Sequence, residues 1–399
     1  MKSESSLKNR KRRKGWMLKR VLLASVVALC LFAYYHERIY LPDQMLKDAI
    51  SKSSRSLYEA EKLVIGSIEQ AGGVYPDAEL FRTQLLVLQG RGDEGLGQFS
   101  LISNPEELSA EKLCDLGRIA QSHREMLLAE KAFSAIPSDS ELYTQVLRSL
   151  IQIHLEMGKE DQTLLECRQL VNIEPQDATA WQVLGTIAMN RKDLSEAVSA
   201  FRSCLSHSTD PKQLREVRED LIQVLIDEGN TIEARKEMST LVAVSGTRSP
   251  RAVLEEAYLL RLDGMANEAI ALLEPLVQRE DGFQVRAMFL RGLLYADIGA
   301  AEKAVADLTF VTNLQPWHKE AHHKLSVICS QLGNTSVAEE HRKMAEHLTD
   351  LALELLNATS QLAKNPADME VRTRVAFLYE QLGQPEQAQR LLGLKNGGS

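Results

Sequence analysis

The chain has 399 residues, of which 44% are hydrophobic and only 5% aromatic, and its formal net charge is −8. Residues 2–20 hold nine lysines and arginines, so the rest of the chain has 38 basic and 54 acidic residues. This acidic body argues against binding to a phosphate backbone, which needs dense lysine and arginine, and we expect no nucleic-acid partner. No alternating pattern typical of strands is present, which favours an all-α class.

A basic segment followed by an apolar one begins the chain. No charged residue occurs from Val21 to Tyr35. A hydrocarbon core of about 30 Å needs about twenty apolar residues, and flanking side chains can extend the shorter run. We therefore expect residues 21–40 to form a transmembrane signal-anchor helix and residues 1–20 to form a basic cytoplasmic terminus. The basic flank would then leave the following chain outside the cytoplasm.

Two alternatives to the anchor remain open. A cleaved signal peptide has the same basic-then-apolar order, but no small-residue cleavage site precedes Tyr34. A lipoprotein signal would use Cys30, but Leu29 occupies the position that needs a small residue. We favour a bacterial inner membrane with the chain on its periplasmic side. In a eukaryote the same topology would face the secretory lumen.

Residues 41–75 form the next segment, which is helical from about Gln44 to Gln70. Its apolar residues recur at helical spacing, and Gly72 and Gly73 then interrupt the pattern. We expect this segment to be a stalk or a capping hairpin ahead of the rest of the chain.

An internal repeat dominates the remaining sequence. Its most visible marks are glycines separated by about 34 residues or twice that, most of them followed five residues later by alanine: Gly158, Gly229, Gly264, Gly299 and Gly333. A glycine just past a helix adopts the left-handed cap conformation easily, and a small residue soon afterwards lets a second helix cross closely. Each repeat is therefore a helical hairpin. One hairpin cannot bury its apolar face alone, so neighbouring hairpins must stack.

The clearest repeat runs from Ala178 to about Pro211. Its first helix carries Trp181, Leu184, Gly185 and Ala188, and its second carries Ala197 and Phe201. This pattern resembles the tetratricopeptide repeat (TPR) consensus almost position for position. The resemblance covers about Pro76 to Leu394, with repeats beginning near residues 76, 110, 144, 178, 215, 250, 285, 319 and 369.

The resemblance implies a right-handed α-solenoid of about nine helical hairpins over residues 76–394, followed by a disordered tail, 395–399. Three positions depart from the consensus, since Arg124 and Lys192 replace the turn glycine and Thr163 replaces the small alanine. The last interval is also stretched to about fifty residues. We interpret His341 to about Ala363 as one overlong helix or as an insertion between repeats.

Neither catalytic nor metal-binding patterns stand out. The five cysteines include no CxxC pair; Cys167 and Cys204 occupy core positions of successive repeats, with an inter-repeat disulfide as the alternative. His318 and His322 share a helix face, but zinc usually needs three or four protein ligands. No catalytic triad or phosphate-binding loop is present. We therefore expect no enzyme activity, no metal and no cofactor.

The resemblance also implies where a partner would bind. In TPR proteins the first helix of each repeat lines a concave surface, and its second, fifth, ninth and twelfth positions often contact the ligand. In this chain these positions give the candidate partner-binding residues Arg118, Arg148, Gln152, Gln182, Thr186, Gln223, Arg251, Tyr258, Arg261, Arg286, Phe289 and His323.

The arginines and aromatic residues between Arg251 and Phe289 stand out against the acidic body. Guanidinium groups beside an aromatic ring can hold a carboxylate or an acidic segment. The alternative is that these are ordinary solvated side chains on a helix surface. The lysine and asparagine pair with which TPR proteins clamp chaperone tails is absent from every repeat.

The expected function is that of a membrane-anchored, non-catalytic scaffold that binds a protein or peptide outside the cytoplasm, within a membrane-bound complex. Two other functions remain open. The chain could be a structural subunit of an envelope secretion or polymer-export complex, or an adaptor that recruits an enzyme to the membrane.

Overall fold

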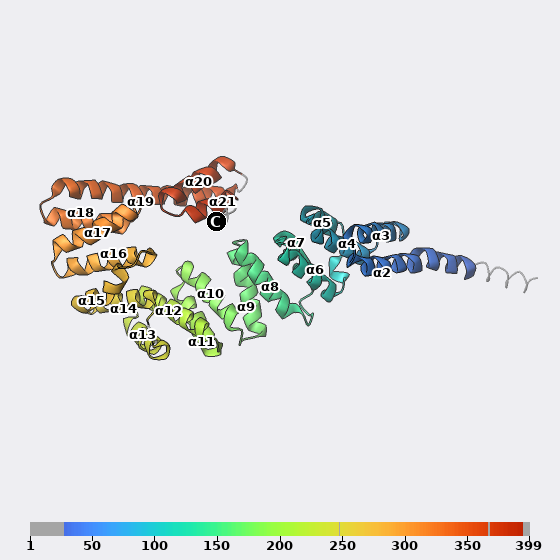
Figure 1. The fold of residues 1–399 in the computed structure, drawn as a ribbon, viewed down its shortest axis with the longest axis horizontal. Helices are drawn as coiled ribbons and strands as arrows, with labels where there is room; N and C mark the ends of the chain where they lie inside the picture. The colour runs from blue at the N-terminus through green and yellow to red at the C-terminus, as the bar shows by residue number, and fades with distance from the viewer. Residues whose placement is uncertain (1–27, 247, 366–367, 394–399) are drawn as a thin grey trace, which may run out of the picture. The chain divides into compact units, whose positions relative to one another are not determined.

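The computed structural model describes residues 28–246, 248–365 and 368–393, and within these ranges it contains helices but no strand. Figure 1 shows the helices following one another as antiparallel pairs. The chain divides into two compact units, residues 1–187 and 188–399, with the boundary inside helix α10 (Ala178–Asn190).

Unit 1 begins with a helical segment, residues 28–35, that continues through a π-helical turn, η1 (His36–Tyr40). The described helices include none that is both long and apolar enough to cross a bilayer. The expected anchor, residues 21–40, is described only from residue 28 onward. The expected cytoplasmic terminus, 1–20, and tail, 395–399, lie outside the described residues.

The remaining elements of unit 1 are helical pairs joined by short turns. They are α2 (Leu41–Ser53), α3 (Leu57–Gln70), α4 (Pro76–Leu88), α5 (Gly92–Phe99), the 3-10 turn η2 (Pro105–Glu107), α6 (Ala110–Ser122), α7 (Met126–Ser134), α8 (Tyr143–Glu156), α9 (Glu160–Ile173) and the first part of α10. The segment predicted as helical from Gln44 to Gln70 is two helices, because the side chain of Ser56 caps α3 by accepting a hydrogen bond from the Glu59 amide at 3.3 Å. Its apolar face packs against α4.

Unit 2 repeats the same pairing after the last turn of α10. Its helices are α11 (Leu194–His207), α12 (Pro211–Asp227), α13 (Thr231–Ser245), α14 (Pro250–Leu262), α15 (Ala266–Val277), α16 (Gly282–Asp297), α17 (Ala301–Leu314), α18 (Lys319–Gln331), α19 (Thr335–Lys364), α20 (Met369–Gln381) and α21 (Pro385–Leu391). The first helices of consecutive hairpins contact one another from α12 through α14 and α16 to α18. Stacking therefore places one helix of each hairpin on a common surface.

Every hairpin turn between α4 and α21 contains one residue with positive φ. Seven are glycines, and the other two are Arg124 and Lys192, each at φ 62°. The two positions where the repeat pattern lacks its glycine thus keep the same left-handed turn. An L-residue in this conformation costs about 1–2 kcal/mol, so the geometry of the turn is retained against an opposing local preference.

Close helix crossing depends on small residues on the first helix of a hairpin. A Cβ added to Gly117 on α6 would lie 2.7 Å from ring carbons of Phe133 on α7. Phe133 is fully buried in the core that these helices share with α8. The phenyl ring of Phe133 therefore fills the space that a side chain at Gly117 would occupy.

Helix α19 is one continuous helix of 30 residues, which confirms the overlong helix and not the insertion. A single buried stripe, including Ala338, Ala345 and Ala358, follows its length. Figure 1 shows α18 along one half of α19 and α20 along the other. Ala358 packs with Val375 and Leu378 of α20. Helix α19 therefore belongs to two packing layers at once.

A contact between distant segments joins these layers. The indole of Trp317, between α17 and α18, occupies the position that a Cβ would take at Gly383, in the turn between α20 and α21. Gly383 also has φ +72°. Only glycine satisfies both the backbone conformation and the contact.

We expect Gly383→Ala to destabilise the protein more than Gly333→Ala. Both glycines have positive φ, where alanine costs about 1–2 kcal/mol. A Cβ at Gly333 meets nothing within 4 Å, whereas at Gly383 it would displace the indole of Trp317. Urea unfolding followed by circular dichroism and tryptophan fluorescence measures both costs. Equal losses in the two variants would contradict the indole contact.

Candidate functional site

A cavity of about 550 Å³ lies on the surface of unit 2 where the first helices of consecutive hairpins meet. A second cavity, of about 640 Å³, shares the lining residues Gln223, Asp227 and Arg286 with it. We call the two together the groove. Its lining residues are Met189, Asn190, Lys192, Gln223, Ile226, Asp227, Arg251, Leu254, Glu255, Tyr258, Arg286, Phe289, Leu290, Leu293 and His318.

Helix caps fix the positions of the helices that line the groove. Ser249 begins α14, with its hydroxyl accepting a hydrogen bond from the Ala252 amide at 3.0 Å. The same hydroxyl donates to Glu219 of α12 at 2.6 Å. Asp281 caps α16 by accepting from the Phe283 amide at 3.0 Å. One cap thus ties α14 to α12 as well as starting the helix.

The floor of the first cavity is apolar. Leu254 of α14 and Leu290 and Leu293 of α16 are buried, and each lines the cavity. Ile226 of α12 is half-buried beside them. Leucines on neighbouring helices therefore form a surface that can receive an apolar side chain.

Glu255 is a buried carboxyl in the wall of this cavity. Its side chain is on the apolar face of α14, and the residue is 4% exposed. Its Oε1 accepts a hydrogen bond from Nε of Arg251 at 2.8 Å, but its buried Oε2 has no hydrogen-bond partner. Burial raises the pKa of Glu255 to about 8, against the opposing effect of Arg251. At neutral pH the carboxyl is therefore mostly protonated, with its proton on the unpartnered Oε2.

Arg286 and Tyr258 add two more polar groups to the wall. Arg286 is exposed on α16 and Tyr258 is half-buried on α14. Within the described ranges, neither side chain makes a hydrogen bond or ion pair. By contrast, Arg251 donates to Asp220 at 2.5 Å as well as to Glu255. The guanidinium of Arg286 and the hydroxyl of Tyr258 are therefore available to a ligand.

Phe289 and His318 close one end of the cavity. Their ring centroids are 4.5 Å apart. Nδ1 of His318 caps α18 by accepting from the Ala321 amide at 3.2 Å. Burial lowers the pKa of His318, so the ring is mainly neutral at neutral pH and carries its proton on Nε2. His318 therefore acts as the cap of α18.

The structure brings together five of the twelve predicted partner-binding residues. Those that line the groove are Gln223, Arg251, Tyr258, Arg286 and Phe289. Arg261, also on α14, lines neither cavity and pairs instead with Asp297 at 2.5 Å. His323 lines a different hollow. The other five are in unit 1: Arg118, Arg148, Gln152, Gln182 and Thr186.

The predicted residues of unit 1 mostly bond within their own unit. Arg118 pairs with Asp115 at 2.6 Å, and Arg148 pairs with Asp177 at 2.8 Å and with Glu174. Gln152 donates to Glu156 at 3.2 Å. The hydroxyl of Thr186 donates to the carbonyl of Gln182 at 2.9 Å. These contacts engage the same side chains that a partner would need.

The sequence analysis missed Glu255, although the sequence does contain a signal for it. Ala252, Glu255 and Leu259 follow one another at helical spacing, and all three are buried. A carboxylate on an apolar stripe is costly unless it is paired or protonated, so it marks a special site.

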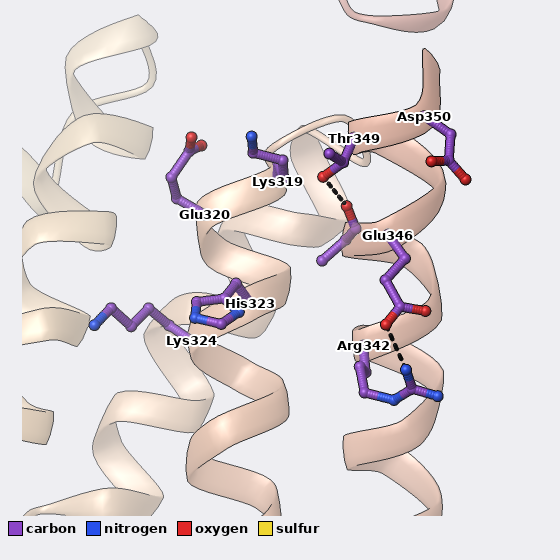
Figure 2. Close-up of a pocket in the computed structure, with 9 residues that line it drawn as sticks. Lys319, Glu320, His323, Lys324, Arg342, Glu346, Thr349 and Asp350 are labelled. Atoms are coloured by element: carbon purple, nitrogen blue, oxygen red, sulfur yellow. Dashed lines mark hydrogen bonds and ion pairs between the residues drawn. The ribbon is translucent and has the colours of Figure 1, made fainter. Parts of the chain in front are cut away.

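Figure 2 shows the different hollow, a notch of about 490 Å³ between α18 and α19. Its walls carry Lys319 and Lys324 together with Glu320 and other acids. Arg342 pairs with Glu346 across one turn of α19. Because charges of both signs alternate along it, the notch matches no single class of ligand.

The other histidines and cysteines that the structure describes can be compared with what a metal site or a disulfide needs. Across the described ranges, no group of three or more suitable side chains could hold a metal ion. The two Nδ1 atoms of His322 and His341 are 2.9 Å apart, and Nε2 of His322 lies 3.0 Å from the Pro316 carbonyl oxygen. Cys167 and Cys204 are free and buried, which raises their pKa to about 12 and about 11 and disfavours the disulfide alternative.

Comparisons with known proteins found one family model and several solved structures that are similar to parts of the chain. A family described as a domain of unknown function (DUF7017) matches residues 149–255, which is less than half of the chain. No curated protein matches. A solved tetratricopeptide repeat protein from Parabacteroides merdae is 17% identical, with 69% of this chain and 98% of that one covered and a TM-score of 0.49.

Two further structures are similar over shorter stretches. MamA from Desulfovibrio magneticus RS-1 is 19% identical, covering 43% of this chain and 95% of its own, with a TM-score of 0.36. YrrB, described as a TPR protein with an unusual peptide-binding site, is 15% identical over 46% of this chain and 91% of its own, with a TM-score of 0.34. At these scores the likenesses carry no argument about the groove.

We expect the stability of the protein to depend on pH through Glu255. Its folded pKa, about 8, exceeds its ordinary value of 4.5. The stabilising effect of holding the proton is therefore complete below about pH 4.5 and is lost as pH rises towards 8. Relative to Glu255→Gln, which cannot ionise, the free energy of unfolding should fall by on the order of 1 kcal/mol per pH unit. Urea unfolding of both proteins at pH 5 and pH 8 measures this; parallel profiles would show that Glu255 is ionised in the fold.

Proposed function

We propose that the chain is a non-catalytic scaffold whose groove in unit 2 binds an extended segment of a partner protein. The observation that carries the proposal is the wall of the first cavity. Three polar side chains there, Glu255, Tyr258 and Arg286, each have at least one group without a partner among the described residues, above a floor of leucines. A few convergent polar groups over an apolar surface are typical of a binding site.

An extended chain suits the groove better than a compact small molecule does. The two cavities join at Gln223, Asp227 and Arg286, and their walls come from α12, α14, α16 and the start of α18. The groove therefore runs across several stacked helices. Because helices held by packing and caps are already in place, little ordering accompanies binding.

We also propose that residues 21–40 anchor the protein in a membrane and that the helical hairpins lie outside the cytoplasm, with a bacterial inner membrane as the favoured location. The charge pattern of residues 1–20 supports this orientation. The described part of the segment adds support, because Leu29, Leu31 and Phe32 are each more than 60% exposed. Such a scaffold would hold its partner at a membrane surface, within a membrane-bound complex.

The alternatives from the sequence analysis use other surfaces. A structural subunit of an envelope complex would contact its neighbours through the second helices of the hairpins, and an adaptor would bring an enzyme's activity with it. A single groove variant separates these alternatives from the scaffold. Arg286 suits this purpose better than Arg251 or Arg261, since replacing either of those leaves carboxylates without their internal partners.

We expect Arg286→Ala to lose the native partner in a covalent crosslinking pull-down of the full-length protein. The loss follows because a cation with no internal partner is removed from the groove without disturbing the fold. Lys236→Ala is the matched control, since Lys236 is an exposed cation on the second helix α13 with no ion pair inside the described ranges. Mass spectrometry of the captured proteins compares the two variants. If both retain the partner, the groove is not its binding site.

We expect full-length protein to remain in the membrane pellet after carbonate extraction, and a Leu31→Asp/Phe32→Asp variant to be released. Charged side chains in the apolar segment oppose its insertion. The matched control is Leu353→Asp/Leu356→Asp, which changes two exposed leucines on α19. Release of the wild-type protein by carbonate would contradict the anchor.

A further inference from the structure

The unpartnered groups of the first cavity have a common chemistry, which narrows the choice of ligand. The Arg286 guanidinium can only donate hydrogen bonds, and the hydroxyl of Tyr258 has a proton to donate. Glu255 is a third donor. Its Oε1 already accepts a hydrogen bond from Arg251, so the proton of the neutral acid is on the unpartnered Oε2. Three donors thus line one wall.

The helices place these donors together. Glu255 and Tyr258 are three residues apart on α14, and residues at this spacing share a helix face. Arg286 is on α16, which packs against α14 and lines the same cavity. The aromatic ring of Phe289 is one turn further along α16 on the same side.

We propose that this wall binds the carboxylate of an acidic side chain in the partner segment, while the leucine floor beside it accepts a large apolar residue of the same segment. The inference rests on the proposed function and names the chemistry of its partner. Arg286 supplies the positive charge, and Glu255 and Tyr258 donate hydrogen bonds to the carboxylate oxygens. Glu255 becomes the residue that sets specificity, because ionisation would turn it from a donor into a repelling charge.

The carboxylate comes from an internal aspartate or glutamate and not from a chain terminus. The cavity that contains the donors continues past Arg286 into the second cavity. A segment whose side-chain carboxylate binds at the donors can therefore continue past Arg286 into the second cavity.

Negative charges already present in the groove are held by internal partners. Asp227 accepts from Gln223 at 2.9 Å and lies 3.4 Å from Nζ of Lys192. Asp220 does not line the groove but pairs with Arg251, which does, at 2.5 Å. Because these carboxylates are engaged, Arg286 is the charged lining residue that has no ion pair within the described part of the chain.

The charged neighbours of Glu255 determine how binding responds to pH. Arg251 on α14 favours its ionisation, whereas Glu219 and Asp220 on α12 and burial oppose it. Arg286 faces the same cavity from α16, and His318 lines it as a mainly neutral ring. Since the competent form is protonated, binding should be strongest below about pH 7 and weaken as the pH rises through 8.

The test begins with selection of random twelve-residue peptides on the detergent-solubilised full-length protein at pH 7. Selected peptides should contain aspartate or glutamate close to leucine, phenylalanine or tryptophan. Isothermal titration calorimetry then compares each peptide with its asparagine or glutamine analogue and with its C-terminally amidated form. We expect the neutral analogue to bind the wild-type protein at least ten-fold more weakly, and the acidic peptide to bind Arg286→Ala at least ten-fold more weakly. Amidation of the peptide and the Lys236→Ala substitution should leave the affinity unchanged.

The pH profile isolates Glu255. If only the protonated form binds, the apparent affinity falls about ten-fold between pH 7 and pH 9, because the competent fraction falls by that factor. In Glu255→Gln this fall should shrink. A pH profile of affinity that is equally steep in both proteins would overturn the role of Glu255. Tyr258→Phe, by contrast, should weaken binding at all pH values.

The outcomes separate the two proposals. Neutral peptides that bind and are lost in Phe289→Ala would overturn the carboxylate inference but leave the groove as the binding site. Loss of affinity on amidation would assign the wall to a terminal carboxylate and overturn the internal one. If no peptide is selected, or if binding survives both Phe289→Ala and Arg286→Ala, the proposed function fails as well.

Discussion

The tight crossing of two helices after a left-handed turn is the constraint on which the rest of this protein depends. All the hairpin turns between α4 and α21 keep a residue at positive φ, including two where the residue is not glycine. The turn brings the second helix back onto the first, and a gap such as the one at Gly117 lets a ring fill the interface. Each hairpin then presents an apolar face that only its neighbour can cover.

The groove follows from this stacking. Helices α12, α14, α16 and α18, each the first of its hairpin, pack side by side. Their outward residues therefore share one surface before any ligand binds. The same packing removes Glu255 from water, and burial changes the chemistry of its carboxyl at neutral pH. In the proposed binding mode, this local feature of the interior sets what the groove recognises.

Sequence periodicity predicted the helices well because each repeat has its own internal signals. The turn glycines, the small residues and caps such as Ser249 act within one hairpin, so they can be read from the sequence without its neighbours. The starts of the helices, and the overlong helix near residue 341, came from such signals. The division between α2 and α3 was harder, because a serine cap inside an amphipathic stretch is a weaker mark.

The site could be predicted only in part, for a different physical reason. Helical position identified which side chains face outward, and five of them do line the groove. It could not show that Arg251 and Arg261 are held by Asp220 and Asp297, about thirty residues away in the sequence, while Arg286 is not. Ion pairs between repeats depend on side-chain reach across a packed interface, which periodicity does not contain.

The long helix α19 has a consequence for how the protein can vary. One half of α19 packs against α18 and the other half against α20. Trp317, just before α18, contacts Gly383, just after α20. Helices α18 to α21 therefore form an end module with its own internal register. Because these contacts are made within the module, adding or removing a hairpin earlier in the array would leave them in place, so the length of the array and the packing of this module can change independently.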